Sequence, residues 1–419
     1  MNEVTRAPAA RSADALGARP ALIRLCAAGF LAYCSYAICR TPLLPLFARE
    51  LGADAPLVGF VVGASTLTGI VLKLPAGAWS DVLGRRPLLV AGAVVFAVLP
   101  FGYLGVSTLG ALIALRFVHG SATAIFGPVA SAGLSDVAPV ARRATWLSTY
   151  STVQGAGQAL GPVLAGYLIA DGRFNLAFAS AGMVALGAPV IMASWTSPQA
   201  PARREGRWRE VGRGVASIGR ERLILLTSGA QAAQFVLNGT LNAFLPLYGH
   251  EVLGVSVARL GWLFGLQTLT TLATRPLMGI TSDRLGRRGM IVSGLALCSA
   301  AVLLVSRVAN FPALLATVCV YAAGVAVTTA STSAYVTDLA HRSRFGAAHG
   351  VFGTIYDVGD ALGPIGAGVL VGSVGYARMF QIMGGAALVV TVVFGVWSRE
   401  SRRGVTDDRL AGGPTVAPE

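Results

Sequence analysis

The sequence predicts an all-α polytopic membrane protein, with twelve transmembrane helices in two six-helix pseudo-repeats. Three observations support this prediction. Hydrophobic residues make up 54% of the 419 residues and charged residues only 12%, which is about half of the charged share of a globular protein. The apolar residues occur in runs of about 20–27 residues, long enough to cross a bilayer core as helices. A charged turn near residue 80 returns near residue 282, which indicates two related halves.

Each apolar run is expected to be a helix, because irregular backbone cannot face lipid and the runs are too long for the strands of a barrel. In chain order, the predicted helices cover about 22–48, 57–80, 87–106, 109–133, 145–170, 174–196, 222–249, 257–281, 289–307, 311–337, 347–371 and 376–398.

The remaining segments are short turns, a disordered cytoplasmic tail (1–21), a basic cytoplasmic linker (197–221) and a second cytoplasmic tail (399–419). The expected domains are therefore an N-terminal six-helix bundle (22–196) and a C-terminal six-helix bundle (222–398). They leave no room for a soluble catalytic domain, so no enzyme activity is expected.

The net charge of +14 follows the predicted topology. If the N-terminus lies inside the cell, most lysines and arginines fall in the tails and the inward-facing loops. The positive-inside rule then makes both termini cytoplasmic, and the Arg- and Ala-rich composition suggests a bacterial inner membrane. No nucleic-acid partner is needed to explain the charge. The expected partners are the lipid bilayer, protons and a small-molecule substrate, and the chain is expected to work as a monomer.

No cofactor or metal is expected. The five cysteines lie in predicted helices and lack the spacing of a zinc site. The sequence has no P-loop, no H-E-x-x-H and no G-x-S-x-G pattern. ATP is therefore not expected to drive the protein directly.

The turn G-x-x-S-D-x-L-G-R-R is the strongest sign of an internal repeat. Its copies are 202 residues apart, and the same offset relates Lys73 to Arg275 and Asp136 to Asp338. Helices 1–6 therefore repeat as helices 7–12, in parallel, since an even number of crossings restores the orientation. The residues of the pattern are Gly77, Asp81, Gly84, Arg85 and Arg86 in the first half, and Gly279, Asp283, Gly286, Arg287 and Arg288 in the second.

Twelve predicted helices, two six-helix halves and this turn between helices 2 and 3 resemble the major facilitator superfamily over about residues 20–400. Within it, the chain is similar to the twelve-helix drug/metabolite:proton antiporters. Arg116, Gly120 and Ala124 match the family pattern R-x-x-x-G-x-x-x-A in helix 4, although the family often has Gln where this chain has His119. The resemblance implies alternating access, in which the two halves rock about a central site.

A second motif, in helix 5, resembles the antiporter motif of the family. Its residues are Gly157, Gly161, Pro162 and Gly166, and Ala165 replaces one glycine of the usual terminal pair. The resemblance implies export, and the departure at Ala165 makes this implication less specific.

The acid of the charged turn is not explained by topology, whereas the arginines of the turn are. A carboxylate at a helix end can face the N-terminus of another helix or pair with arginine. The resemblance implies that it latches one half to the other in one state of the transport cycle. Asp81 would then meet the start of helix 11, near Ala347–Gly350, and Asp283 the start of helix 5, near Arg143–Trp146. An ordinary charged turn is the alternative.

Charged side chains within a membrane are costly, so each one is a candidate for function. Asp357 and Asp360 are three residues apart and share one face of helix 11. Their repeat mates are Gly155 and Gln158, so the acids occur in the second half alone. The four charged residues well inside predicted helices are Arg40, Arg116, Asp357 and Asp360.

Two adjacent buried carboxyl groups are suited to carry a proton. Burial disfavours the charged form of Asp357 and Asp360, and their mutual repulsion disfavours it further, so the pair could take up and release a proton near neutral pH. A structural ion pair with Lys73 or Arg40 is the alternative, and contact with substrate is a third.

The arginines have different roles in this hypothesis. Arg116 is permanently charged and could hold an anion or influence a nearby acid, and the resemblance implies a place on the cavity wall and a role in coupling. His119, three residues on, could titrate or simply pack. Arg40 shares a helix face with Tyr36, and helix 1 has no acid. Two arginines would make the cavity positive and favour anionic, zwitterionic or neutral substrates. A fixed pair between Arg40 and an acid would weaken that inference.

Polar stripes at helical spacing mark further cavity candidates. Gln234, Asn238 and Asn242 follow one face of helix 7, and Thr328 and Thr332 follow helix 10. The resemblance implies that helices 1, 4, 7 and 10 line the transport path, although such residues also mediate helix packing.

These observations favour a secondary transporter that exports small drug-like or metabolic compounds in exchange for protons. The first alternative is proton-coupled uptake of a small organic anion. A second is a substrate sensor that does not transport.

Overall fold

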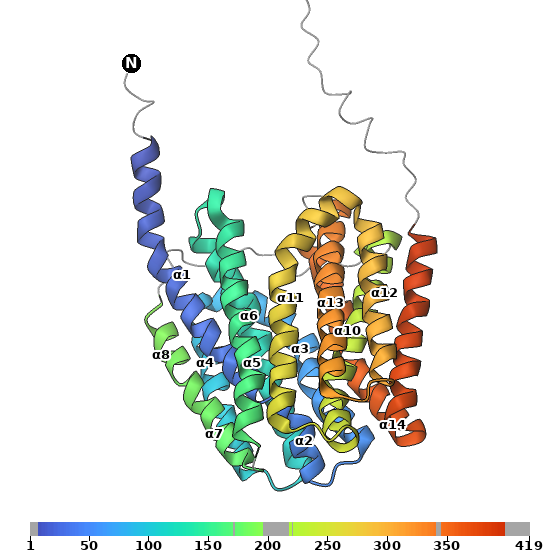
Figure 1. Ribbon diagram of the computed structural model, residues 1–419. Coiled ribbons are helices and arrows are strands. Elements are labelled where there is room, and N and C mark those ends of the chain that lie inside the picture. Colours follow the sequence, from blue (N-terminus) through green and yellow to red (C-terminus); the bar gives the residue numbers. More distant parts are fainter. Residues whose placement is uncertain (1–6, 171, 196–217, 220, 341–344, 399–419) are drawn as a thin grey trace, which may run out of the picture.

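The computed structural model describes residues 7–170, 172–195, 218–219, 221–340 and 345–398, which fold into helices without a strand (Figure 1). The first half of the chain, blue to green, and the second half, yellow to red, lie largely side by side. The predicted second tail (399–419) and most of the predicted linker (197–221) lie outside the described residues.

Local sequence signals mark some of the helix ends of the first half. The side chain of Asp54 accepts a hydrogen bond from the backbone N–H of Leu57, and Thr108 does the same for Ala111, as N-cap residues do. Gly84, with φ of 92°, makes the sharp turn between two helices. The helices are α1 (Ala7–Ile38), α2 (Leu43–Glu50), α3 (Ala55–Leu83), α4 (Arg85–Gly102), α5 (Leu109–Val137), α6 (Arg143–Leu168), α7 (Phe174–Ala185) and α8 (Gly187–Ala193).

The second half repeats this plan. Gly286, the repeat mate of Gly84, has a φ of 89° and makes the equivalent turn. Gly375, with a φ of 79°, breaks the last element into the two spans that the sequence predicts. The helices are α10 (Arg222–Leu247), α11 (Val257–Leu285), α12 (Arg287–Val305), α13 (Phe311–Leu339) and α14 (Phe345–Trp397), with a π-helical turn at Tyr248–Val252.

The first helix is longer than the first apolar run. α1 begins at Ala7, within the segment 1–21 that the sequence predicts as a cytoplasmic tail, and continues through Pro20 into that run. A proline inside a helix costs one hydrogen bond, which the rest of a long helix can outweigh.

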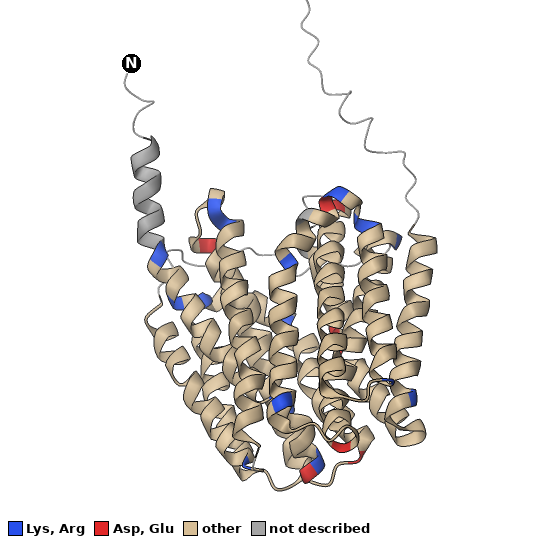
Figure 2. Ribbon diagram, in the orientation of Figure 1, with Lys and Arg blue, Asp and Glu red and all other residues tan. Residues whose placement is uncertain are grey.

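Every predicted apolar run coincides with a described helix or pair of helices. By length and composition, eight helical segments of the described residues could cross a membrane, with α14 counted once. α6, α10 and α11 are not among these segments, because polar residues lower their mean hydropathy. The number of twelve crossings therefore stays a prediction. Charged residues gather mainly at the two ends of the bundle, and few lie in its middle (Figure 2).

The two ends of the bundle differ in how the halves meet. We call the end that carries Gly84 and Gly286 the motif end, and the end that carries Gly52 and Gly254 the far end. One apolar cluster near the far end contains residues of both halves, including Phe47 and Phe244. Nearer the motif end, the halves have separate apolar clusters.

The space around the glycines also differs between the two ends of the bundle. A Cβ atom at Gly59 would lie 2.1 Å from the carbonyl oxygen of Pro364, in the other half. Beside the motif end, a Cβ at Gly77 or at Gly279 would have no atom within 4 Å. The halves therefore pack tightly toward the far end and separate toward the motif end.

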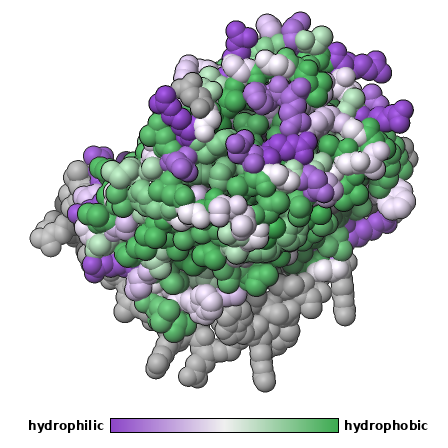
Figure 3. All heavy atoms as spheres, turned by 90° about the horizontal axis from the view of Figure 1, so that it is seen from below, coloured by the Kyte–Doolittle hydropathy of each residue, from purple (hydrophilic) through white to green (hydrophobic). Residues whose placement is uncertain are grey.

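An ion pair joins the halves at the far end. The Nε atom of Arg49 donates to Glu251 at 3.1 Å, and the hydroxyl of Tyr376 donates to the same carboxylate at 2.8 Å. Figure 3 views this end and shows hydrophilic residues gathered over part of it, with hydrophobic residues over much of the rest. The far end is thus closed by packing and by polar contacts.

Candidate functional site

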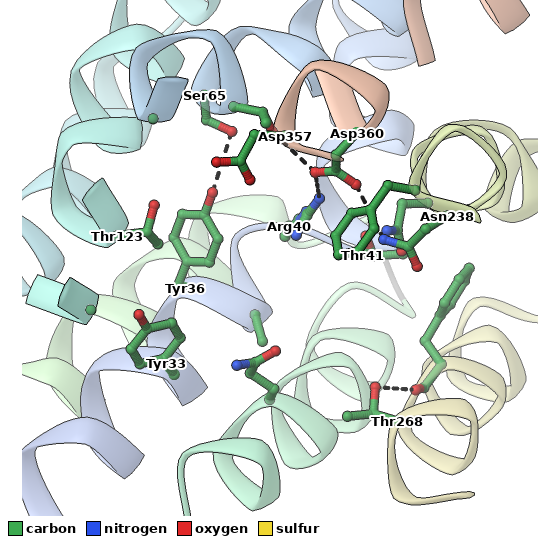
Figure 4. A pocket seen from close by; sticks show the side chains of 18 of the residues that line it. Tyr33, Tyr36, Arg40, Thr41, Ser65, Thr123, Asn238, Thr268, Asp357 and Asp360 are labelled. Carbon is green, nitrogen blue, oxygen red and sulfur yellow. Dashed lines mark hydrogen bonds and ion pairs between the residues drawn. The ribbon is translucent and has the colours of Figure 1, made fainter. Parts of the chain in front are cut away.

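A cavity of about 580 Å³ lies between the halves (Figure 4). A second lobe of about 360 Å³ adjoins it and shares Arg40, Asn238 and Asp360 with it. Six of the predicted proton-coupling and substrate-cavity residues line the main cavity, namely Tyr36, Arg40, Asn238, Asn242, Asp357 and Asp360, and so does Pro162 of the helix 5 motif. Gln234 lines the second lobe. Arg116, His119, Thr328 and Thr332 line neither lobe.

Asp360 is the centre of polar contacts in this cavity. Its carboxylate accepts hydrogen bonds from Arg40, Thr66 and Asn238, each at 3.2 Å. In Figure 4 the side chains of Arg40 and Asn238 approach it from different sides. The donors come from the turn after α1, from α3 and from α10, so this carboxylate of α14 holds together elements of both halves.

Asp357 forms a second pair across the halves. Its carboxylate accepts a hydrogen bond from the ammonium group of Lys73 in α3. The side chains of Asp357 and Asp360 are only 9% and 10% exposed, and a buried charge is tolerated when it is paired and hydrogen-bonded. Both acids thus have the ion-pair geometry that the sequence left as one of its alternatives.

The two pairs change the expected electrostatics of the cavity. Arg40 and Lys73 are each compensated by an acid of the other half. Arg116 is fully buried behind the cavity wall, where it donates to the hydroxyl of Ser65 at 2.6 Å and lies over the ring of Tyr36. The argument for a positively charged cavity is therefore weakened, in the way that a fixed pair of Arg40 with an acid was expected to weaken it.

His119 is buried beside Arg116 and contacts aromatic residues. Its Nδ1 atom and the hydroxyl of Tyr103 are 3.1 Å apart, and its ring packs edge-on against Tyr36. These contacts correspond to the packing alternative for this histidine. A role of His119 or Arg116 in proton coupling stays a prediction.

The polar stripe between α10 and α13 is mainly a helix contact. The hydroxyl of Thr332 donates to Gln231 at 2.5 Å, and the amide of Gln231 donates to Gln234 at 3.0 Å. Thr328 donates to the carbonyl of Gly324 in its own helix at 2.9 Å. These groups satisfy one another, as polar residues between membrane helices commonly do.

Some residues of the cavity wall were not predicted from the sequence. Thr66, which holds Asp360, and the rings of Phe235 and Tyr356 all line the main lobe. Phe235 could have been found, because it lies three residues before Asn238 on the same face of α10. A single threonine such as Thr66 in an apolar run carries no comparable signal.

The first arginine of each charged turn joins two acids of its own half. Arg85 contacts Asp81 at 2.5 Å, and its Nε atom donates to Asp136 at 2.9 Å. In the second half, Arg287 makes the same two contacts with its repeat-related acids, also at 2.5 and 2.9 Å. Each set of three residues, Asp81–Arg85–Asp136 or Asp283–Arg287–Asp338, is called a clamp below.

The second arginine of each turn contacts the end of the last helix of its half. Arg86 donates to the carbonyl of Ala193, and Arg288 donates to the carbonyl of Gly395. Cations are favourable at helix C-termini, where carbonyl groups lack partners. The doubled turn therefore ties the helices of each half together.

The latch between the halves stays a prediction. The side chain of Asp283 is 62% exposed, and Arg143 at the expected docking point is also exposed. Residues 341–344, just before the docking point expected for Asp81, lie outside the described residues.

The glycines of the helix 5 motif, which lies in α6 of the structure, are at close contacts between helices. Cβ atoms at Gly157 and Gly161 would lie 2.6 and 2.8 Å from carbonyl oxygens of α1, and one at Gly166 would lie 2.8 Å from the carbonyl of Val257. Their repeat mates Gly359, Gly363 and Gly368 make the equivalent contacts with α10 and α3. Packing accounts for these glycines in both halves.

No metal site is visible in the described part of the chain, which contains no group of three or more His, Cys, Asp or Glu side chains placed to hold a metal ion. The cavity offers hydrogen-bonding and charged groups, together with aromatic surface. These groups are suited to binding a small molecule.

Comparison with known sequences agrees with this architecture. The profile of the Major Facilitator Superfamily matches residues 25–261 and 227–417. An uncharacterized MFS-type transporter of Methanocaldococcus jannaschii is 24% identical over 359 residues, which are 84% of this chain and 92% of that relative. Multidrug resistance protein 1 of Bacillus subtilis is 28% identical over 150 residues, or 36% of this chain and 38% of the relative. Quinolone resistance protein NorA of Staphylococcus aureus strain MRSA252 is 24% identical over 35% of this chain and 37% of its own length.

Solved structures show the same fold. A bacterial homologue of the human lysosomal transporter Spinster, in an inward-facing and unoccupied conformation, has a TM-score of 0.76 and 14% identity, over 90% of this chain and 95% of that one. The nucleoside transporter NupG has a TM-score of 0.75 and 16% identity, over 90% of this chain and 99% of that one. With the family profile matching most of its length, the chain belongs to the Major Facilitator Superfamily, whose members are membrane transporters and not enzymes.

Proposed function

We propose that this protein exports small drug-like or metabolic compounds in exchange for protons, by alternating access across a bacterial inner membrane. The observation that carries the proposal is that two ion pairs lie inside the cavity. Each joins a cation of the first half, Arg40 or Lys73, to an acid of the second half, Asp360 or Asp357.

Alternating access requires the halves to change their contacts around the cavity. A proton bound to Asp360 would remove the charge that holds Arg40 and would weaken the pair between the halves. The same step at Asp357 would free Lys73. A substrate in the cavity could compete for the same groups, so proton and substrate would occupy the site in turn.

The charge distribution supports an orientation with the motif end in the cytoplasm. With the motif end in the cytoplasm, as the positive-inside rule predicts for its many arginines, the end at which the halves separate would face the cytoplasm. A compound could then enter from inside the cell, which is the loading step of an exporter. In the opposite state Asp81 and Asp283 would form the latch.

The substrate class is inferred from the cavity wall and from two relatives. The wall combines aromatic rings such as Tyr33, Tyr36 and Phe264 with amide groups and two compensated charge pairs. Such a surface is suited to compounds with apolar rings and a few polar groups. Two relatives are named for multidrug and quinolone resistance.

Transport in proteoliposomes tests the proposal. A pH gradient is imposed, and a panel of anionic, neutral and cationic compounds is screened while the flux of protons and of each compound is followed. Movement of a compound against the proton flux is expected. Movement with the protons would contradict export and establish uptake. Absence of any flux across the panel would count against transport and favour the sensor.

A further inference from the structure

A groove on the surface of the second half lies apart from the central cavity. It encloses about 530 Å³ between the start of α10 and the last turns of α14, at the motif end. Its floor is Phe394, which is only 2% exposed, and its walls include Leu225 and Val393, each 37% exposed. Val392 and Val396 beside it are more exposed still, so this face of the membrane protein is turned toward lipid.

The groove has free space along its length. A Cβ atom at Gly229, one of its lining residues, would meet no atom within 4 Å. A side chain could therefore be added there without a clash. The lining is apolar except at one position, Arg222, so the groove suits a hydrocarbon chain.

The mouth of the groove is cationic. The guanidinium of Arg222 lies over the ring of Trp397, 5.8 Å from its centroid, and Arg288 contacts Gly395 in the same last turns of α14. Arg222 is exposed, and its exposed neighbour Glu221 is the nearest acid along the chain. Among the described residues, no carboxylate lies within ion-pair distance of Arg222, so none of them neutralises its charge.

We propose that this groove binds an anionic phospholipid, with one acyl chain over Phe394 and the phosphate at Arg222. Apolar packing would hold the chain, while the arginine supplies the selectivity, because an anionic headgroup gains roughly 1 kcal/mol for each nearby cation. That gain corresponds to a preference of about fivefold over a zwitterionic headgroup. The site is independent of the transported substrate.

Fluorescence of Trp397 tests the proposal in reconstituted vesicles. The full-length protein is placed in bilayers that contain brominated phosphatidylglycerol or, in a separate set, brominated phosphatidylcholine at the same mole fraction. Bromine quenches only nearby tryptophan, and the difference between the unmodified protein and Trp397→Phe isolates the signal of this one residue. The relative association constant of phosphatidylglycerol should be about five times that of phosphatidylcholine.

Three variants separate the parts of the site. Arg222→Gln should reduce the preference to near unity while quenching by both lipids persists. Gly229→Leu should fill the groove and reduce quenching by both lipids. Gly366→Leu is the matched control, because that glycine of α14 is exposed, has equally open space and lies outside the groove, and it should change neither quantity.

Two results would overturn the proposal. Equal quenching by the two lipids in the unmodified protein would mean that the groove does not select an anionic headgroup. Weak quenching by both lipids, with chemical cross-links between copies at this face, would assign the groove to a second copy of the chain.

Discussion

α6 and the first span of α14 occupy the same place in the two halves, and their comparison separates packing from chemistry. Gly161 of α6 meets the carbonyl of Cys34 in α1, and Gly363 of α14 meets the carbonyl of Val236 in α10. Every one of these positions has its partner 202 residues along the chain. The contact between the fifth and first helices of each half is therefore the same structure made twice.

The polar residues of the two helices differ. α14 carries Asp357 and Asp360 where α6 carries Gly155 and Gln158. Both acids pair with cations of the other half, and no acid of the first half lines the cavity in the described structure. The repeat thus keeps the helix contacts equal, while the ionisable groups of the cavity wall are distributed unequally. Equal effects are expected for packing variants and unequal effects for charge variants.

The largest effect is expected for Asp360→Asn. The variant keeps the shape of the side chain but removes the charge that holds Arg40, so pH-driven transport should fall at least about 100-fold, equivalent to about 2.7 kcal/mol. Transport under a pH gradient and substrate exchange without a gradient are measured in proteoliposomes. Substrate exchange without a gradient should persist if the variant loses only the coupling of transport to protons.

The double variant Arg40→Gln with Asp360→Asn controls for folding, because it leaves no unpaired buried charge. It should restore expression and thermal stability but not coupling. Full pH-driven transport by Asp360→Asn would show that this acid is only structural.

A nearly equal effect in the two halves is expected for Gly161→Val and Gly363→Val. Each valine would push two helix backbones apart, and overpacking of this kind costs about 2 kcal/mol. Thermal unfolding in detergent should show similar losses for both. A variant at Gly161 that lowers export while leaving stability unchanged would instead support a specific antiport role for the helix 5 motif.

Lys73 and Arg275 are repeat mates whose substitutions should differ. Lys73→Gln leaves Asp357 without its cation, so the rate of pH-driven transport should fall about tenfold, or about 1.4 kcal/mol. Arg275 lines the second lobe and has no acid within ion-pair distance among the described residues, so Arg275→Gln should cost less than threefold. Equal losses for the two variants would mean that the pair with Asp357 does not matter for transport.

The smallest effect is expected for the two clamps, whose loss should change the free energy of unfolding by slightly different amounts. Asp81 is 18% exposed and Asp283 is 62% exposed, and screening by water weakens the more exposed pair. Arg85→Gln should therefore reduce the free energy of unfolding by about 1 kcal/mol and Arg287→Gln by less. Thermal unfolding at low and high salt tests whether Arg85→Gln destabilises the protein more than Arg287→Gln does. A larger effect of salt on the contribution of Arg287 than on that of Arg85 would support the role of screening by water.

Much of this architecture was predictable because the signals are local. Long apolar runs predict helices in lipid, and Gly84 and Gly286 mark sharp turns that the structure places between consecutive helices. The pair Asp357 and Asp360 was identifiable as a candidate functional site because charges are rare in membrane helices. The family resemblance implied a place on the cavity wall for Arg116, and the polar stripe predicted one for Thr332, but neither residue lines either lobe. Helical periodicity identifies a polar face but does not say whether that face meets a cavity or another helix.

By itself the sequence determined the fold class, the doubled plan of the halves and the candidate acids, since hydropathy, glycine turns and the offset of 202 are properties of the chain alone. Only the tertiary structure decided which cation meets which acid. Arg40 and Asp360 are 320 residues apart, and no spacing rule pairs them. Their contact depends on how the two halves close around the cavity, because electrostatic pairing acts over a few ångströms in space and not along the chain.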